Sequence, residues 1–103
     1  MSNALRLALL VDPLMVRLGG AEHAGELAAA LAARGHEVCA FGAELQGAGA
    51  AQVRPVALSV LGFRPDAVLA YDALSPAAWL GSRIARRRKI PLVLIEAGAF
   101  RGG

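Results

Sequence analysis

The feature that most constrains the fold is a series of short, almost uninterrupted apolar segments. Residues 5–11 (LRLALLV) form the first of them, and Asp12-Pro13 ends it. Strands of an antiparallel sheet usually alternate apolar and polar side chains, whereas a continuous apolar run of this length is typical of a strand buried on both faces of a parallel sheet. We therefore expect residues 5–11 to form the first strand of a parallel sheet.

The segment after this strand has helical periodicity. Gly19-Gly20 precede residues 21–34, and Gly35 follows them as a typical helix-ending residue. Five apolar residues within the segment recur at spacings of three and four, which places them on one helix face: Ala24, Leu27, Ala28, Leu31 and Ala32. Residues 37–42 (EVCAFG) then predict a second short strand, which completes a β-α-β unit.

The third strand is the weakest of the predicted elements. Residues 43–52 are rich in Gly and Ala without periodicity and predict a loop, and residues 53–58 follow as a short strand. Pro55 favours the edge of the sheet, because proline donates no hydrogen bond to a neighbouring strand. The connection 59–65 is shorter than the dozen residues that a parallel crossover usually needs. Either this strand is not a regular parallel member, or the connection is strained or exchanged between chains.

The rest of the chain returns to a regular alternation. Residues 66–71 (DAVLAY) predict the fourth strand and residues 91–95 (PLVLI) the fifth. Between them, Ser75-Pro76 supplies a helix cap and a first helical residue, and the helix is expected to run to about Arg88. We expect its inner face to carry Trp79, Leu80 and Ile84. These elements predict an α/β fold: a three-layer, Rossmann-like domain with a mainly parallel sheet of about five strands.

Length and composition exclude several classes of protein. The 103 residues suit one domain, assigned to residues 5–103, with residues 1–4 interpreted as an added leader. No apolar run approaches the roughly 18 residues of a membrane span, and no secretory signal is recognisable, so a cytoplasmic location is expected. The single cysteine, Cys39, allows neither a disulfide framework nor a cysteine zinc site. No metal or cofactor is predicted.

Four motifs together resemble the group 1, or family 4, glycosyltransferases of the GT-B fold. They are Gly19-Gly20-Ala21-Glu22 at the start of the first helix, Arg64-Pro65-Asp66 before the fourth strand, Tyr71-Asp72 at its end, and residues 90–94 entering the fifth strand. The resemblance covers nearly the whole chain. It implies the N-terminal, acceptor-side half of an enzyme that transfers a sugar from a nucleotide diphosphate donor, and hence a chain that is truncated and inactive alone.

The carboxyl ends of the strands are the expected ligand edge, because ligands of open α/β sheets bind there. Glycines at a helix N-terminus admit close approach of an anion, so Gly19, Gly20 and Glu22 are assigned to the donor phosphates. A structural role is an equal alternative for Glu22, whose carboxylate would stabilise the N-terminus of the helix. The residues assigned to the acceptor side share a position at the ends of strands: Asp12, Tyr71, Asp72, Glu96, Ala97 and Gly98.

Two positions depart from the family pattern, and both concern histidines. Many relatives carry a histidine where this chain has Ala97, and another where it has Tyr71. Alanine neither donates a hydrogen bond nor transfers a proton, and tyrosine lacks the near-neutral pKa of histidine. No catalytic residue is therefore assigned. Of the two histidines in the chain, His23 is expected to be solvated and His36 to be a turn or packing residue.

The net charge of +3 and the pI near 10 come largely from one basic stretch, Arg83 and Arg86 to Lys89. Nucleic acid is not expected as a partner, because no aromatic residues are interleaved with these cations. One interpretation is that the cations complement the dipole of a helix C-terminus. The other is a peripheral contact with anionic lipid, to which each cation adds about 1 kcal/mol.

Two alternatives to the enzyme interpretation remain at this stage. One is a noncatalytic half-domain used for dimerisation or scaffolding, and residues 14–16 (LMV) together with the short connection 59–65 predict a homodimer. The other is a generic dinucleotide-binding domain, which is disfavoured because the first turn lacks the G-x-G-x-x-G motif.

Overall fold

The computed structural model describes residues 4–12, 21–42, 45, 47–54, 60, 62–71 and 76–95. Within them, five strands and two helices follow one another in the order β-α-β-β-β-α-β and confirm the predicted α/β, Rossmann-like fold. The strands are β1 (Arg6–Leu10), β2 (Glu37–Phe41), β3 (Gln52–Arg54), β4 (Ala67–Tyr71) and β5 (Leu92–Ile95). The helices are α2 (Ala21–Ala33) and α3 (Pro76–Arg88).

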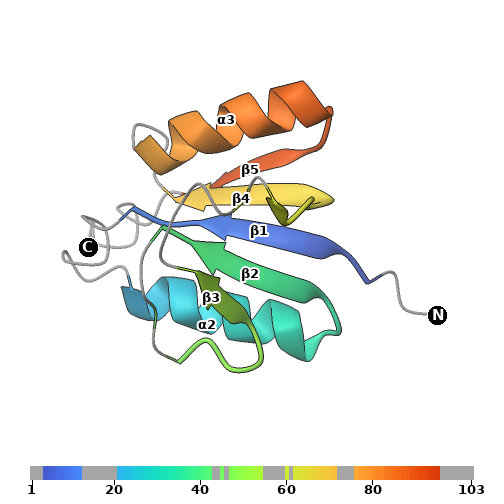
Figure 1. Ribbon diagram of the computed structural model, residues 1–103. Helices are drawn as coiled ribbons and strands as arrows, with labels where there is room; N and C mark the ends of the chain where they lie inside the picture. Colours follow the sequence, from blue (N-terminus) through green and yellow to red (C-terminus); the bar gives the residue numbers. More distant parts are fainter. Residues whose placement is uncertain are drawn as a thin grey trace.

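The five strands form one sheet in the order β3-β2-β1-β4-β5, and every neighbouring pair is parallel. The two helices cover opposite faces of this sheet (Figure 1). The side chains of β1 pack on both faces of the sheet, because successive residues of a strand point to opposite sides. Leu7 and Leu9 pack with α2, whereas Ala8 and Leu10 pack with α3. Burial on both faces explains why residues 5–11 read as a continuous apolar run.

Both helices end at a left-handed residue, and the N–H of the next residue donates to the carbonyl five positions back. At the end of α2, Gly35 N–H donates to Ala32 C=O and His36 N–H donates to Leu31 C=O, and Gly35 has a φ of 95°. This Schellman motif needs a left-handed residue, which glycine supplies without strain. At the end of α3, Ile90 N–H donates to Ala85 C=O, and the left-handed residue is Lys89, with a φ of 56°. The end of α2 is relaxed, whereas the end of α3 is strained.

The inner face of α3 is built mainly from small residues: the expectation that Ile84 lies on it is confirmed, and the expectation that Trp79 does is wrong. The buried residues of this helix are Ala77, Ala78, Gly81, Ile84 and Ala85. A Cβ at Gly81 would lie 3.1 Å from Leu10 Cδ1 and 3.2 Å from Val68 Cγ1, so the helix backbone sits close to the sheet. No space for an indole remains there, and Trp79 is 64% exposed.

The connection between β3 and β4 is longer than the sequence indicated. β3 ends at Arg54, so residues 55–66 form a twelve-residue link that meets the usual requirement for a parallel crossover. β3 is at the sheet edge, as Pro55 predicted, and it pairs with β2 as a regular parallel strand. In the described part of the link, Val60 and Phe63 are buried on the α3 face, with Phe63 edge-on to Phe41 at 5.5 Å. These two side chains thereby anchor the described part of the link to the sheet.

A polar cluster closes the amino end of the sheet. The Arg6 guanidinium donates to Glu37 Oε2 (2.7 Å) and to the Phe63 carbonyl, and lies 4.3 Å from the centre of the Phe63 ring. Asp66 exchanges two hydrogen bonds of 2.7 Å with the backbone of Arg6. His36 Nδ1 accepts from Leu5 N–H at 3.1 Å, which agrees with the turn role expected for this histidine. The cluster ties β1 to β2 and to the start of β4.

Cys39 lies on β2 and is fully buried. Burial raises the pKa of its thiol, because the charged thiolate loses its hydration there. Within the described residues, neither helix is long and apolar enough to cross a membrane.

Candidate functional site

The order of the strands defines one place where a ligand would fit. From β1 the chain proceeds outward through β2 to β3, and then returns to β4 on the other side of β1 before it continues to β5. The sheet therefore reverses its direction of growth between β1 and β4, and the helices that follow these two strands, α2 and α3, cover opposite faces. Such a switch point, at the carboxyl ends of the strands, is where open α/β sheets bind ligands.

Three described side chains meet the carboxyl ends of β1 and β4. Asp12 follows β1 after Val11, and Tyr71 is the last residue of β4. His23 lies in the first turn of α2, whose N-terminus lies at this end because the helix runs back along the sheet. Asp12 and Tyr71, which the sequence predicted as site residues, thus fall at the switch point, and so does His23, which was not predicted.

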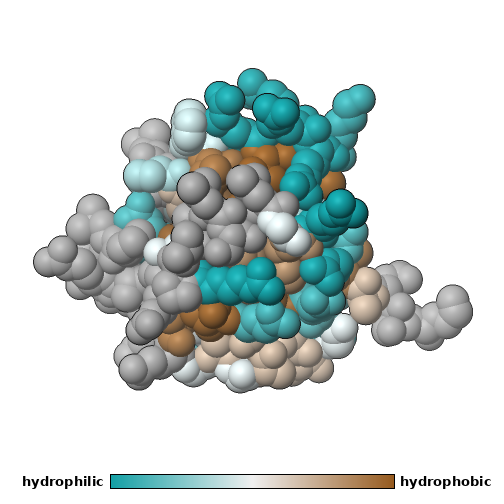
Figure 2. Space-filling view, viewed as in Figure 1, coloured by the Kyte–Doolittle hydropathy of each residue, from teal (hydrophilic) through white to brown (hydrophobic). Residues whose placement is uncertain are grey.

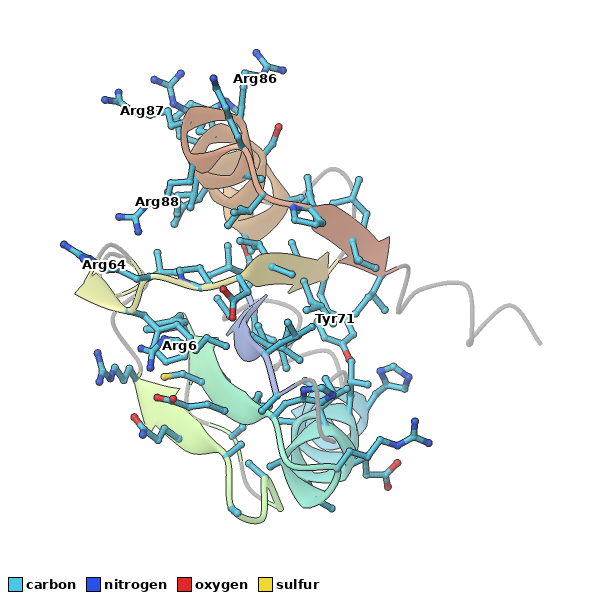
Figure 3. The ribbon with its side chains drawn as sticks, turned by 90° about the vertical axis from the view of Figure 1, so that its right-hand side faces the viewer. Arg6, Arg64, Tyr71, Arg86, Arg87 and Arg88 are labelled. Atoms are coloured by element: carbon cyan, nitrogen blue, oxygen red, sulfur yellow. The ribbon has the colours of Figure 1, made fainter. Side chains whose placement is uncertain are left out.

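Tyr71 extends from β4 toward α2, on the face that this helix covers (Figure 3). Its side chain is fully buried, and this burial raises the pKa of its hydroxyl to about 12, because a buried phenolate would lose its hydration. The phenol is therefore neutral at physiological pH. It provides a hydrogen-bonding hydroxyl at the switch point, but it does not act there as a base.

His23 contacts Tyr71, and the expectation that this histidine is solvated is wrong. His23 is half-buried, its Nδ1 lies 2.8 Å from the Tyr71 hydroxyl oxygen, and the two rings pack edge-on with centroids 5.5 Å apart. The hydroxyl donates to Nδ1 when the ring hydrogen is on Nε2, and Nδ1–H donates to the hydroxyl oxygen when it is on Nδ1. In both cases the contact holds the orientation of the ring.

The remaining predicted site residues are not placed by the described structure. Glu22 lies in the first turn of α2, and nothing is described of its side chain. The others fall in three segments that lie outside the described residues: Gly19, Gly20, Asp72, Glu96, Ala97 and Gly98. Asp12 and Tyr71 are therefore the two predicted residues that the structure brings to one edge, and their roles toward a ligand stay predictions.

The pairing of His23 with Tyr71 was missed because the two residues are 48 positions apart. The available signal was indirect: a histidine one turn into the helix after the first strand, and a tyrosine ending the fourth. These positions become neighbours only if the first and fourth strands are adjacent, which the strand order decides. Among the described residues, no group of three or more His, Cys, Asp or Glu side chains gathers as a metal site.

The class of this protein is defined by its fold and its site, because comparison with known proteins identifies no relative. No protein-family model, curated protein or solved structure matches this chain. The strand order, the helices on opposite faces and the polar pair at the switch point define a doubly wound, Rossmann-like α/β domain.

Proposed function

We propose that this chain is the acceptor-side domain of a nucleotide-sugar-dependent glycosyltransferase. In this proposal a sugar passes from a nucleotide diphosphate donor to an acceptor hydroxyl, once a donor-binding domain faces the carboxyl end of the sheet. The observation that carries it is the reversal of strand order between β1 and β4, with Tyr71 and His23 meeting at that point. Two of the four family-like motifs support the same edge. Gly19-Gly20-Ala21-Glu22 precedes or begins α2, and Tyr71-Asp72 starts at the last residue of β4.

The proposal divides the edge between phosphate and acceptor. Gly19, Gly20 and Glu22 belong to the turn that approaches the donor phosphates. The acceptor side takes the residues at the ends of the strands: Asp12, Tyr71, Asp72, Glu96, Ala97 and Gly98. The neutral Tyr71 and the alanine at position 97 leave no base among the matched family positions, so the acceptor hydroxyl is expected to lose its proton to a group of the donor or of the facing domain.

The first test is a titration of the isotope-labelled chain with nucleoside diphosphates and inorganic pyrophosphate, followed by NMR. We expect amide shifts at the carboxyl end, at Asp12, His23 and Tyr71, and none at the amino-end residues Arg6 and Asp66. A nucleoside without phosphates is the control ligand and should cause no shifts. Shifts confined to the amino end, or no shifts with any phosphate ligand, would contradict the proposed site.

Gly20→Val is the matched variant for this titration. A β-branched side chain in the turn blocks close approach of a phosphate to the backbone, so the shifts should disappear. Gly62→Val makes the same change at a position where an added Cβ meets open space, and it should leave the titration unchanged. Equal titrations of a folded Gly20→Val chain and the wild type would place the ligand elsewhere.

The second test is activity. We expect no sugar transfer by this chain alone from any nucleotide donor, because the proposal assigns most of the donor contacts to another domain. A screen of nucleotide sugars with mass-spectrometric detection of released nucleotide measures this. Turnover by the purified chain would show that the acceptor-side assignment is wrong.

A second candidate function, self-association, is favoured by the strand β5. It is an edge strand without a charged residue, and Val93 and Leu94 are 49% and 46% exposed. Val68 N–H donates to Pro91 C=O, so the backbone groups of alternate residues, Leu92 and Leu94, point away from β4. The opposite edge is protected, because β3 has three residues and exposes Gln52 and Arg54.

Light scattering at tens of micromolar tests this candidate. If two copies pair through β5, the chain is a dimer, and Leu94→Lys restores a monomer by placing a charge on the pairing edge. The sequence also predicted a dimer from element exchange through the connection 59–65, which in the structure is part of the twelve-residue link 55–66. Lengthening that connection with Gly and Ser restores a monomer only in the case of exchange, and a wild-type chain that stays monomeric on concentration excludes both routes.

A further inference from the structure

The outer surface of α3 combines an exposed indole with a row of arginines. Trp79 is 64% exposed, the largest exposed fraction among the large hydrophobic residues described. The guanidinium of Arg83 lies over its ring, 5.1 Å from the ring centre. At 100° per residue, Trp79, Arg83, Arg86 and Arg87 share one side of the helix, opposite the buried residues. We call these four residues the α3 outer stripe.

The charge of this surface has one sign. The sequence of α3 contains four arginines and no acidic residue, and Lys89 follows directly. Arg86 and Arg87 extend away from the sheet, and hydrophilic side chains gather over this helix on the outside of the domain (Figures 2 and 3). Cations in the last turn complement the helix dipole, but Arg83 and Trp79 lie earlier in the helix, where that explanation does not apply.

We propose that the α3 outer stripe is a docking surface for an anionic lipid bilayer. Arginines attract the negative headgroups, and an indole is the side chain that prefers the boundary between headgroups and acyl chains. The inner face of α3 is committed to the sheet through Ala77, Gly81 and Ile84, so the helix lies flat on the bilayer and does not insert. The contact is shallow, reversible and sensitive to salt.

The geometry favours lipid over single-stranded nucleic acid as the occupant. Nucleic-acid modules stack successive bases on several open aromatic faces. Here a single aromatic side chain lies on α3, and Arg83 already occupies a face of its ring. The edge of the indole and the surrounding guanidinium groups suit a headgroup layer, which needs no open ring face.

Vesicle binding tests the proposal, and the chain supplies its own probe because Trp79 is the only tryptophan. The intact chain is mixed with phosphatidylcholine vesicles and with vesicles that also contain phosphatidylglycerol, and is followed by co-sedimentation and by tryptophan emission. We expect binding and a blue shift with phosphatidylglycerol at low salt, and neither with phosphatidylcholine alone. Absence of binding to the anionic vesicles, or equal binding to both kinds, would overturn the proposal.

A charge-matched pair of variants separates the stripe from net charge. The triple change Arg83→Gln, Arg86→Gln and Arg87→Gln should weaken vesicle binding roughly a hundredfold, at about fivefold for each arginine. The control triple change is at exposed arginines outside α3: Arg34→Gln, Arg54→Gln and Arg64→Gln. It should weaken binding less than about fivefold. Equal losses in the two variants would show that overall charge, not the stripe, is responsible.

Two further measurements distinguish the remaining outcomes. Trp79→Ala should abolish the emission signal and weaken co-sedimentation at constant charge, and an unchanged co-sedimentation would remove the indole from the proposed surface. An oligothymidylate is titrated in parallel. If it binds through the same arginines more tightly than the anionic vesicles do, the surface is a nucleic-acid site and the lipid proposal is wrong.

Discussion

The two ends of the sheet hold polar side chains of different kinds. At the amino end, Arg6, Glu37, Asp66 and His36 bind one another or backbone groups of neighbouring segments, across sequence separations of 31 to 60 residues. At the carboxyl end, Tyr71 and His23 form a pair beside the start of the loops that carry the predicted site. The first group stabilises the fold, whereas the second lies at the edge where we propose that a ligand binds. Changes at the two ends should therefore have separable effects on stability and on binding.

The largest expected effect is alkaline destabilisation through Tyr71. The folded state raises the pKa of this hydroxyl from 10.0 to about 12. The contribution of the neutral hydroxyl to the unfolding free energy is therefore fully present below pH 10 and is lost as the pH rises to about 12. A shift of this size corresponds to roughly 3 kcal/mol of unfolding free energy. Urea titrations between pH 8 and pH 12, read by circular dichroism, measure the loss. In Tyr71→Phe this component should be absent, and an identical pH profile in both chains would contradict it.

Arg6→Ala tests the amino end, and we expect it to lower the unfolding free energy by about 2 kcal/mol. The change removes charge-assisted hydrogen bonds to the Phe63 carbonyl and to Glu37, together with the stacking on the Phe63 ring. Arg64→Ala, at an exposed arginine nearby, is the control and should cost little. Phosphate-induced NMR shifts at the carboxyl end should persist in the folded Arg6→Ala chain. Their loss would show that the two ends are coupled.

Asp66→Ala should lower the unfolding free energy by about 1 kcal/mol, the usual contribution of one hydrogen bond. The lost bond is the one that Arg6 N–H donates to the Asp66 carboxylate, at 2.7 Å. Asp66→Asn keeps an acceptor oxygen at the same position and should retain most of the stability. Equal losses in the two variants would mean that the negative charge matters, and not the acceptor.

The smallest effect is a gain at the end of α3. Lys89 occupies a left-handed conformation that glycine adopts without strain, so Lys89→Gly should raise the unfolding free energy by about 0.5–1 kcal/mol. Gly35→Lys makes the reverse change at the equivalent position of α2 and should cost a similar amount. Chemical denaturation of the two variants measures both values. If both variants are destabilised, local strain does not explain the difference between the helix ends.

Both helices and four of the strands were predictable because their signals are local, whereas the third strand, expected over residues 53–58, ends at Arg54. Continuous apolar runs follow from burial on both faces of a parallel sheet, and the α2 periodicity ends at Gly35, where the structure has its cap. Trp79 was placed wrongly because hydrophobicity was taken as a guide to burial, whereas close packing of α3 selected alanine and glycine. Small residues at helical spacing were the better signal for the inner face.

The polar contacts were not predictable, because each joins segments that only the strand order brings together. Arg6 stands at the start of an otherwise apolar strand, which indicates a need for partners but does not identify Phe63 and Glu37. His23 and Tyr71 depend in the same way on β4 lying beside β1. The ligand edge could be predicted from the fold class alone, whereas the side chains that meet there required the arrangement of the strands.

The burial of Cys39 allows the opening of the sheet to be measured through the reactivity of its thiol. The thiol is the only one in the protein, lies on the inner strand β2 with no exposed surface, and has a pKa raised by burial. A thiol-reactive dye therefore labels Cys39 only in molecules whose sheet has opened, because the reactive thiolate needs water. The labelling rate under native conditions reports the frequency of that event. We expect it to rise in Arg6→Ala and to fall in Lys89→Gly, without any denaturant.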